Sequence, residues 1–324
     1  MDFSTIALAA SATVAATVAT AACCMRDAKY NALHDAEQSH TATQSHAATA
    51  PRRYDMALNQ SRASQDHIIC YQGLVDTNGQ KFDAICVFDG HGFNQCIIAL
   101  RSMDLRQFFV QPNPCAAVFE ACRGFEGGAT MNLFRIYANR IENHNIGDSQ
   151  AKVFMQVDGQ WTIQAASVMH SPDNQAECAR LDGRVNYSKS SPDLNNITGP
   201  NVITSNEPGI YVQFIGTPLR LALTQALGHK GLTGCRPEFF SVPIVQGQRY
   251  RAVNGSDGIW DVLGNFDHKE LCTLSAQGII DFVRARYAQE WNVTFGGVYA
   301  NHPDQKYTMA REQWDDCSVG ICDI

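Results

Sequence analysis

The stretch from Phe82 to Phe93 constrains this chain more than any other, because an apolar run stops there abruptly at an acid, two glycines and a histidine. The run alternates with a period of two, which predicts a strand buried on at least one face. Asp89 stands at the end of that strand, where a carboxylate can meet a hard cation, and Gly90 lets a backbone carbonyl approach as a second ligand. His91 follows and can donate a proton at the same place. The stretch therefore predicts a metal site at a strand end.

Composition narrows the class of protein. With 324 residues and 45% hydrophobic content, the chain can bury a sizeable core, and we expect one large domain. A net charge of −7 and a pI near 5.8 argue against nucleic acid as the main partner, since no basic run is present to displace phosphate counterions. The 12 cysteines form no Cys-x-x-Cys pair and several lie in apolar runs, which predicts free, buried thiols and a reducing compartment.

The chain divides into three parts. Residues 1–25 carry an uncharged, Ala-rich segment that would span roughly 34 Å as a helix, enough for a bilayer core. Its hydropathy is marginal and it lacks a basic n-region, so a membrane anchor and an Ala-rich leader stay open as alternatives. Residues 26–51 have the low complexity of a linker. We predict that residues 52–324 form the folded domain. We expect this domain in the cytoplasm, and we expect it to associate with a membrane only if the leader inserts into one.

Two further acids occur before the middle of the chain. Asp66 opens a strand that a turn around 77–79 would fold back, so that Asp66 and Asp89 lie on adjacent strands. Asp148 lies in a tight turn, where an aspartate bonded only to its own turn is the ordinary alternative. This turn belongs to a meander of strands expected at 131–137, 140–146, 151–157 and 161–165.

Two more acidic landmarks occur toward the C-terminus. Asp257 stands where a strand ends and a helix begins, whereas we interpret Asp261 as an ordinary first-turn acid stabilised by the helix dipole. Asp315 begins an acidic pair that leads into a final short strand. We expect helices at 94–109, 114–125 and 268–287, a Pro-started, carboxylate-capped helix within 170–181, and a mobile polar flap at 188–208. Long consecutive antiparallel strands predict an α+β class.

Four motifs together resemble the PPM family, the metal-dependent type 2C protein Ser/Thr phosphatases. The similarity covers roughly 54–324, and four motifs in register are far more specific than any one of them. Gln65-Asp66 and the Asp315 run look closer to plant-type branches than to bacterial ones. The motifs are Phe88-Asp-Gly-His-Gly92, Gly147-Asp-Ser149, Ser256-Asp-Gly-Ile-Trp-Asp-Val262 and Asp315-Asp-Cys-Ser-Val319.

The resemblance implies a four-layer αββα sandwich of two antiparallel sheets flanked by helices. It also implies a site for two Mg²⁺ or Mn²⁺ ions, with a third ion held more weakly. In that site Asp89 would bridge both metals, the Gly90 carbonyl would ligate one, and Asp257 and Asp315 would hold the other. Asp66 matches the acid of the family's first motif. Asp148 matches the residue associated with the third ion.

The implied chemistry is phosphomonoester hydrolysis by a metal-bridging water. Hard oxygen ligands hold ions that lower the pKa of the water, which attacks phosphorus without a covalent enzyme intermediate. His91, with a pKa expected near neutrality, would give a proton to the leaving Ser or Thr oxygen. The implied partner is a phosphoprotein substrate.

The chain departs from the family pattern at four places outside these metal acids. The usual acid before Asp66 is Gln65, so one water-mediated metal contact would be lost. The arginine that binds substrate phosphate is replaced by Ser61, and we expect Arg62, one position later, to take that role. The family's Arg and Asp in the stretch 221–229 are Gln225 and His229.

Three hypotheses follow. The favoured one is an active Mg²⁺- or Mn²⁺-dependent protein Ser/Thr phosphatase. The alternative is a pseudophosphatase, a binding module that keeps the fold with impaired catalysis. A metal-dependent hydrolase of small phosphorylated molecules would share the site but show no preference for phosphopeptides.

Overall fold

The computed structural model describes residues 52–61, 64–194 and 196–324. The predicted leader at 1–25, the linker at 26–51 and Arg62 lie outside the described residues. In the ranges just given, no helix is both long and apolar enough to cross a membrane. The described residues belong to one compact unit, 50–324.

Two antiparallel sheets form the centre of this unit. The first has five strands in the order β1-β19-β16-β7-β8, and each pair of neighbours is antiparallel. Its first and last strands in the sequence, β1 and β19, are therefore neighbours in space. The bounds are β1 (Arg53–Asn59), β7 (Gln150–Val157), β8 (Gln160–Ala166), β16 (Arg249–Gly255) and β19 (Cys317–Asp323).

The second sheet has seven strands in the order β14-β4-β3-β5-β6-β15, and β2 also pairs with β3. All of these pairs are antiparallel too. The bounds are β2 (Asp66–Val75), β3 (Lys81–His91), β4 (Gly128–Ala129), β5 (Met131–Tyr137), β6 (Arg140–Ile146), β14 (Leu227–Gly228) and β15 (Glu238–Pro243).

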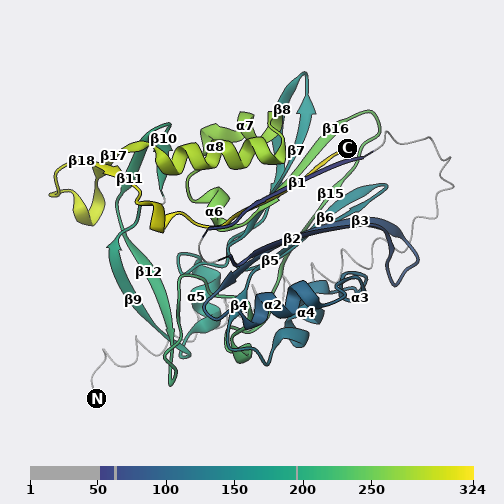
Figure 1. Cartoon of the computed structure of the whole chain (residues 1–324), viewed down its shortest axis with the longest axis horizontal. Helices are drawn as coiled ribbons and strands as arrows, with labels where there is room; N and C mark the ends of the chain where they lie inside the picture. The colour runs from purple at the N-terminus through teal and green to yellow at the C-terminus, as the bar shows by residue number, and fades with distance from the viewer. Residues whose placement is uncertain (1–51, 62–63, 195) are drawn as a thin grey trace, which may run out of the picture. The chain divides into compact units, whose positions relative to one another are not determined.

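Helices cover the outer face of each sheet (Figure 1). Those over the seven-stranded sheet are α2 (Gln95–Ser102), α3 (Arg106–Phe109) and α4 (Pro114–Cys122). Those over the five-stranded sheet are α6 (Asp257–Trp260), α7 (His268–Thr273) and α8 (Ala276–Ala288). Figure 1 shows α7 and α8 on one side, α2 and α4 on the other, and the two sheets between them. This is the αββα layering and the α+β class that the sequence predicts.

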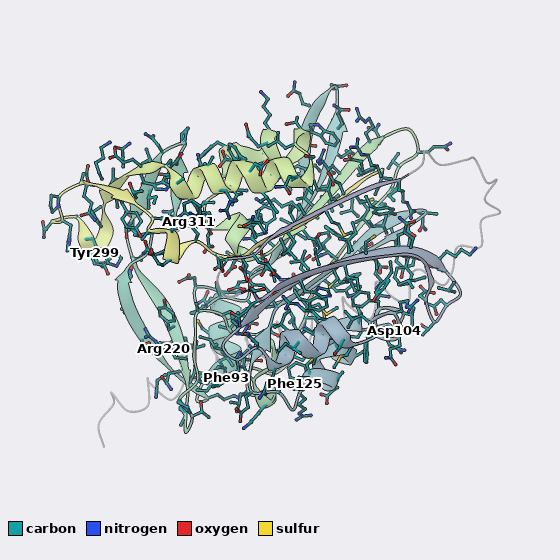
Figure 2. All side chains as sticks on the ribbon, viewed as in Figure 1. Phe93, Asp104, Phe125, Arg220, Tyr299 and Arg311 are labelled. Carbon is teal, nitrogen blue, oxygen red and sulfur yellow. The ribbon has the colours of Figure 1, made fainter. Side chains whose placement is uncertain are left out.

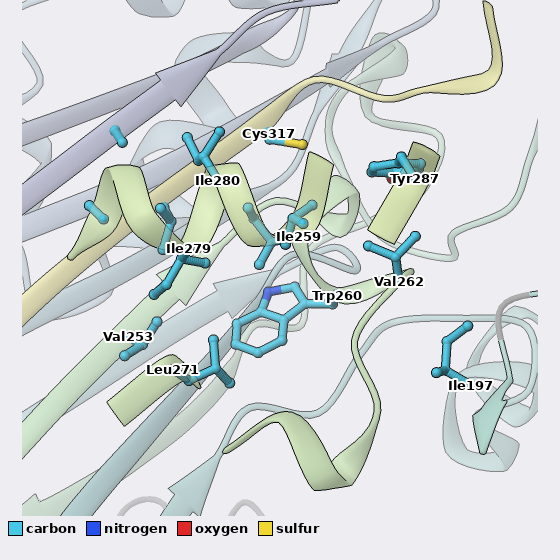
Figure 3. Packing of buried hydrophobic residues seen from close by; sticks show 14 of the residues in the cluster. Ile197, Val253, Ile259, Trp260, Val262, Leu271, Ile279, Ile280, Tyr287 and Cys317 are labelled. Carbon is cyan, nitrogen blue, oxygen red and sulfur yellow. The ribbon is translucent and has the colours of Figure 1, made fainter. Parts of the chain in front are cut away.

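The strand β3 shows why the sandwich has four layers. Its residues Phe82, Ala84, Cys86 and Phe88 pack under α2 to α4, whereas Ile85 points into the cluster between the two sheets. Both faces of β3 are therefore buried, as the period-two alternation of the sequence allows. A third cluster lies under α6 to α8, and Figure 3 shows Ile259, Trp260, Leu271, Ile279 and Ile280 packed together there.

The remaining strands form two small sheets. One has the order β13-β12-β9 and the other the order β10-β11-β17-β18, in which only β11 and β17 are parallel. The bounds are β9 (Val185–Pro192), β10 (Ile197–Gly199), β11 (Val202–Ser205), β12 (Pro208–Phe214), β13 (Arg220–Leu221), β17 (Glu290–Phe295) and β18 (Gln305–Thr308). Most of the segment 188–208, where we expect a mobile flap, pairs as β9, β10 and β11, and its mobility stays a prediction. The 3₁₀ turns are η2 (His229–Gly231), η3 (Asn265–Asp267), η4 (Gly297–Tyr299) and η5 (Arg311–Gln313).

Three helix predictions need correction, each because a polar side chain sets a boundary. The helix expected at 94–109 is interrupted near Asp104, whose carboxylate accepts from the backbone N–H of Arg106 at 3.3 Å. The helix expected at 268–287 breaks before Ser275, which caps α8 by accepting from Gly278 at 3.1 Å. The third helix, α5 (Gln175–Leu181), is capped by the Asn174 amide and not by a carboxylate.

Core packing between the sheets yields a first prediction. Phe134 is 0% exposed in the cluster between the two sheets, so Phe134→Ala should destabilise the chain by about 3–5 kcal/mol, since it leaves a cavity that the strands cannot close. Urea unfolding of the full chain measures this. The matched control is Phe93→Ala, because Phe93 is 66% exposed (Figure 2) and its loss should change stability by less than about 0.5 kcal/mol. Equal effects of the two substitutions would contradict the assigned packing.

Candidate metal centre

The first two acids come together through the pairing of β2 with β3. Asp66 and Asp89 lie on adjacent strands, as the sequence predicts, and they are direct partners in this antiparallel register. The backbone N–H of Gly90 donates to the carbonyl of Gln65 at 3.1 Å. A Cβ at Gly90 would lie 3.0 Å from that carbonyl oxygen and 3.1 Å from Cβ of Ile97, so the tight packing here favours glycine, and a side chain would require its neighbours to shift.

The next two acids come from the other sheet. Asp257 is the first residue of α6, directly after β16, and Asp315 lies just before β19, the strand that pairs with β16. A Cβ at Gly258 would lie 2.0 Å from the carbonyl oxygen of Asp316 and 3.1 Å from Cβ of Asp315. Glycine at 258 therefore lets the start of α6 meet the segment that carries Asp315.

Asp148 reaches the same place through a turn after β6. Gly147 has a φ of +106°, a conformation that favours glycine, and this turns the chain toward Asp148. Thr130 links the turn to β3, because its Oγ1 accepts from the N–H of Asp89 at 3.1 Å and lies 2.6 Å from Oγ of Ser149. The Asp148 turn is thus fixed against the end of β3.

These acids interact electrostatically, and we refer to them as the acid cluster. Burial and the repulsion of neighbouring carboxylates raise the pKa of Asp66 and of Asp148 to about 8 and that of Asp315 to about 7. Burial, with Asp257 and Asp66 as the leading neighbours, also holds the pKa of Asp89 well above its ordinary value. The members of the acid cluster are Asp66, Asp89, Asp148, Asp257, Asp261 and Asp315.

Asp261 corrects a sequence interpretation. It lies at the C-terminal end of α6 and not in a first turn, so the helix dipole does not account for it. Burial and then Asp257, Asp148 and Asp315 raise its pKa well above the ordinary value, which places its carboxyl group among the other acids. The four-residue spacing from Asp257 could have indicated this, because residues i and i+4 share one face of a helical turn.

The donor set of the cluster fits a hard divalent cation. Oδ1 of Asp66, of Asp148 and of Asp257 are buried and have no hydrogen-bond partner, and a cation would satisfy these bare oxygens and relieve the repulsion. The other oxygen of Asp66 accepts from Ser256 Oγ at 2.7 Å, which leaves Oδ1 as its available ligand atom. Among the residues that the structure describes, no group of three or more His, Cys, Asp or Glu side chains is arranged to hold a metal ion as it stands.

A loop beside the cluster carries the departures from the family pattern. The Asp316 carboxylate accepts from the backbone N–H groups of Ser61 and Gln65, so an acid that sequence reasoning left unassigned anchors the segment that carries Arg62. The Gln65 side chain donates to the carbonyl of Gly92 at 3.2 Å and to Asn94. A carboxylate could not donate these bonds. Glutamine at 65 therefore ties this loop to the one that follows His91.

A second residue that sequence reasoning missed lies at the same loop. Arg101, near the end of α2, donates through Nη2 to the carbonyl of Ser64 at 2.9 Å and to the carbonyl of Asp66 at 2.8 Å. Arg101 is exposed, so it brings a positive charge to the surface beside the cluster.

His91 ends β3 next to the cluster, and its environment differs from the sequence expectation. Burial and then the neighbouring His229 lower the pKa of His91 to about 3, so the expectation of a pKa near neutrality is wrong. Nδ1 of His91 lies 2.9 Å from Nε2 of His229. Nε2 of His91 is buried and has no hydrogen-bond partner. His229, which differs from the acid of the pattern that the sequence resembles, thus places an imidazole directly against His91.

Comparison with known proteins gives one clear result. No family model matches this sequence, and no curated protein matches it significantly. Solved structures do match. A sex-determining protein of C. elegans superposes with a TM-score of 0.56 at 17% identity, covering 92% of this chain and 71% of that one. The serine-threonine phosphatase 2C of Toxoplasma gondii superposes with a TM-score of 0.53 at 12% identity, covering 84% of this chain and 94% of that one.

This chain has the fold of a type 2C phosphatase. The likeness confirms the sandwich that the four motifs imply, and at these identities it shows the fold alone. The plant-type subdivision and the roles of the individual site residues stay predictions.

The repulsion within the acid cluster yields a second prediction. Asp148→Asn should stabilise the metal-free chain at pH 8.5 by about 1–3 kcal/mol, because it removes a buried negative charge from among like charges. Thermal unfolding in chelator measures this. The control Asp158→Asn changes an exposed turn residue outside the cluster and should leave the melting temperature unchanged. A lower melting temperature for Asp148→Asn would contradict the electrostatic account.

The same shifts predict a pH dependence. Because Asp66 and Asp148 have folded-state pKa values of about 8 against 3.8 for the ordinary group, the folded state binds protons that the unfolded state has lost. The contribution of these two groups to the free energy of unfolding is therefore fully present below about pH 4 and is lost as the pH rises through 8. Acidification of the metal-free chain from pH 8.5 to 7 should raise the free energy of unfolding by about 1–3 kcal/mol.

This pH window lies above the range in which unfolded histidines titrate, so the buried histidines contribute little to the change. Urea unfolding in chelator at the two pH values measures it. Asp148→Asn should show a smaller change than the natural chain. A free energy of unfolding that is flat or falls on acidification would overturn the assignment of the shifts to the acids.

Proposed function

We propose that this chain is a metal-dependent protein Ser/Thr phosphatase that hydrolyses phosphoserine and phosphothreonine in protein substrates. The observation that carries the proposal is the acid cluster at the junction of the two sheets, with its raised pKa values and its bare buried oxygens. A chain that gathers like charges in a buried place loses stability, and a bound cation offsets that loss. The phosphatase 2C fold puts this cluster in the context of phosphomonoester hydrolysis.

Each acid has a proposed role in holding Mg²⁺ or Mn²⁺. Asp89 would contact both ions, the Gly90 carbonyl would ligate one of them, and Asp257 and Asp315 would hold the other. Asp66 supports the site beside Asp89, because the two are register partners. Asp148 holds the third, weaker ion, and we add Asp261 to it because its carboxyl group interacts with Asp148 and Asp257. When bound, the ions would supply a water of lowered pKa and neutralise charge on the phosphoryl group.

The residues of the chain supply positioning and a proton. Arg62 is proposed to bind the substrate phosphate, because the backbone of its neighbour Ser61 is held by Asp316 beside the cluster. His91 is proposed to give a proton from Nε2 to the leaving Ser or Thr oxygen. Its lowered pKa makes the imidazolium scarce at neutral pH and strongly acidic once formed. A phosphate dianion bound beside His91 would favour that protonated form.

Two observations favour a second candidate, a binding module with impaired catalysis. The pKa of His91 is far below the range that suits an acid at neutral pH, and Gln65 is committed to hydrogen bonds with the 92–94 loop instead of a metal-bound water. Under this reading the chain would keep the fold and bind metal weakly while it recognises a phosphoprotein without hydrolysing it.

Phosphate release decides between the two candidates. The full chain with a phosphothreonine peptide should release phosphate with Mn²⁺ or Mg²⁺ and not with chelator. Asp257→Asn should lower the rate about 100-fold or more, because it removes a charged ligand. The control Asp281→Asn changes an exposed acid of α8 outside the cluster and should keep the full rate.

Calorimetric titration with Mn²⁺ completes this experiment. Metal binding without turnover would favour the binding module. A folded chain that neither binds Mn²⁺ nor releases phosphate would sink the phosphatase proposal.

A further inference from the structure

Two imidazoles meet at the edge of the candidate metal centre. His91 ends β3 and His229 begins η2, 138 positions later in the chain. Nε2 of His229 lies 2.9 Å from Nδ1 of His91, and the two ring centroids are 4.8 Å apart with an interplanar angle of 26°. The nitrogen–nitrogen distance indicates a direct hydrogen bond between the rings and not a contact through water.

The direction of this hydrogen bond follows from a third group. Nδ1 of His229 lies 3.1 Å from the carbonyl oxygen of Glu126. A carbonyl oxygen only accepts, so the proton of a neutral His229 is on Nδ1 and its Nε2 is the acceptor. Nδ1 of His91 must then be the donor. This leaves Nε2 as the nitrogen of His91 that no protein group engages, which agrees with its lack of a partner.

The backbone holds His229 in this place firmly. His229 has a φ of +46° and Lys230 a φ of +51°, left-handed conformations that are uncommon for residues other than glycine. Their backbone N–H groups donate to Gly127 at 3.1 Å and to Phe125 at 2.8 Å, and the Lys230 ammonium pairs with the Glu126 carboxylate at 2.6 Å. These bonds offset the cost of the unusual backbone.

The room between the rings depends on one glycine. A Cβ at Gly128 would lie 2.2 Å from Nε2 of His229 and 2.5 Å from Cε1 of His91. No side chain fits there while the two rings touch. Gly128 belongs to β4, which lies in the sheet between β3, the strand that ends at His91, and β14, the strand that comes just before His229.

We propose that His229 is a positioning residue that fixes the tautomer and orientation of His91: it keeps one proton on Nδ1, so that Nε2 is the nitrogen that takes up and delivers the proton for the leaving oxygen. The inference rests on the proposed phosphatase function. The second nitrogen of a histidine ring is commonly fixed by such a partner, which decides the tautomer. A neutral imidazole at 229 does this without adding another negative charge beside the acid cluster, unlike the acid found there in the family pattern.

A spectroscopic experiment tests the tautomer without any activity. Long-range ¹⁵N–¹H correlation spectra of the histidine rings in the metal-free full chain should show His91 protonated on Nδ1. In His229→Ala the proton should move to Nε2, because the acceptor is gone. His229→Gln keeps an acceptor at the end of the side chain and should keep the proton on Nδ1. Asp281→Asn, a change of an exposed acid of α8 that belongs to neither ring's surroundings, should have no effect on the tautomer.

Kinetics then test the function of the pair. We expect His229→Ala to lower kcat on a phosphothreonine peptide by about 10- to 100-fold with little change in KM, because a poor leaving group needs a well-placed proton. The rate on p-nitrophenyl phosphate, whose leaving group needs no proton, should change less than about threefold. His229→Gln should recover most of the peptide rate.

The outcomes separate this inference from the proposed function. A natural chain with His91 protonated on Nε2 would overturn the inference, and so would equal losses on both substrates in His229→Ala. A natural chain inactive on every phosphomonoester would defeat the proposed phosphatase function, whereas the spectra would still decide the tautomer.

Discussion

Repulsion between buried carboxylates is the constraint on which the rest of this structure depends. Asp66 and Asp89 face each other across β2 and β3, and Asp148, Asp257, Asp261 and Asp315 add their charges to the same place. An isolated strand or helix does not favour bringing these acids together, because each carboxylate is more stable when water solvates it. The packing of two sheets face to face, with helices outside each, supplies the apolar burial that offsets the repulsion.

Close backbone approaches bring the acids within range of one another. Gly258 admits the backbone of Asp316 at a distance that a side chain would prevent, and Gly90 packs tightly against the carbonyl of Gln65. Asp316 then uses its own carboxylate to hold the backbone of Ser61 and Gln65, so one acid of the pair after η5 anchors the loop while the other joins the cluster. Asp315 and Asp316 thus have different roles in the structure, although they are adjacent residues of the same type.

The histidines show how a departure from a family pattern can be compensated. His229 stands where the family pattern has an acid, and its neutral ring accepts from His91 while the Glu126 carbonyl fixes its own proton. Gln65, another departure, donates two hydrogen bonds that an acid could not make. Glutamine at 65 and a neutral histidine at 229 both leave less negative charge near a cluster that is already repulsive than carboxylates would.

The sequence by itself determined much of the fold. The period-two alternation of 82–88, the meander from 131 to 165 and the final strand predict the antiparallel sheets, because side-chain periodicity is a local property. It also predicted that Asp66 and Asp89 lie on adjacent strands, whereas their direct pairing depends on an irregularity between Tyr71 and Leu74 that shifts the register of the hairpin. Helix boundaries at Asp104, Asn174 and Ser275 were harder to predict, because single side-chain bonds set them.

Only the tertiary structure decided the place of Asp261 in the cluster, the anchoring role of Asp316 and the contact of His229 with His91. These relations join residues far apart in the chain, and they depend on how two sheets dock and on where glycine lets backbones meet. The tertiary structure also decided the pKa values of the acids and of His91, because burial and neighbouring charges set these values and the sequence alone gives neither. Residue types and spacing thus determined which groups are available, whereas docking of the layers determined their environment.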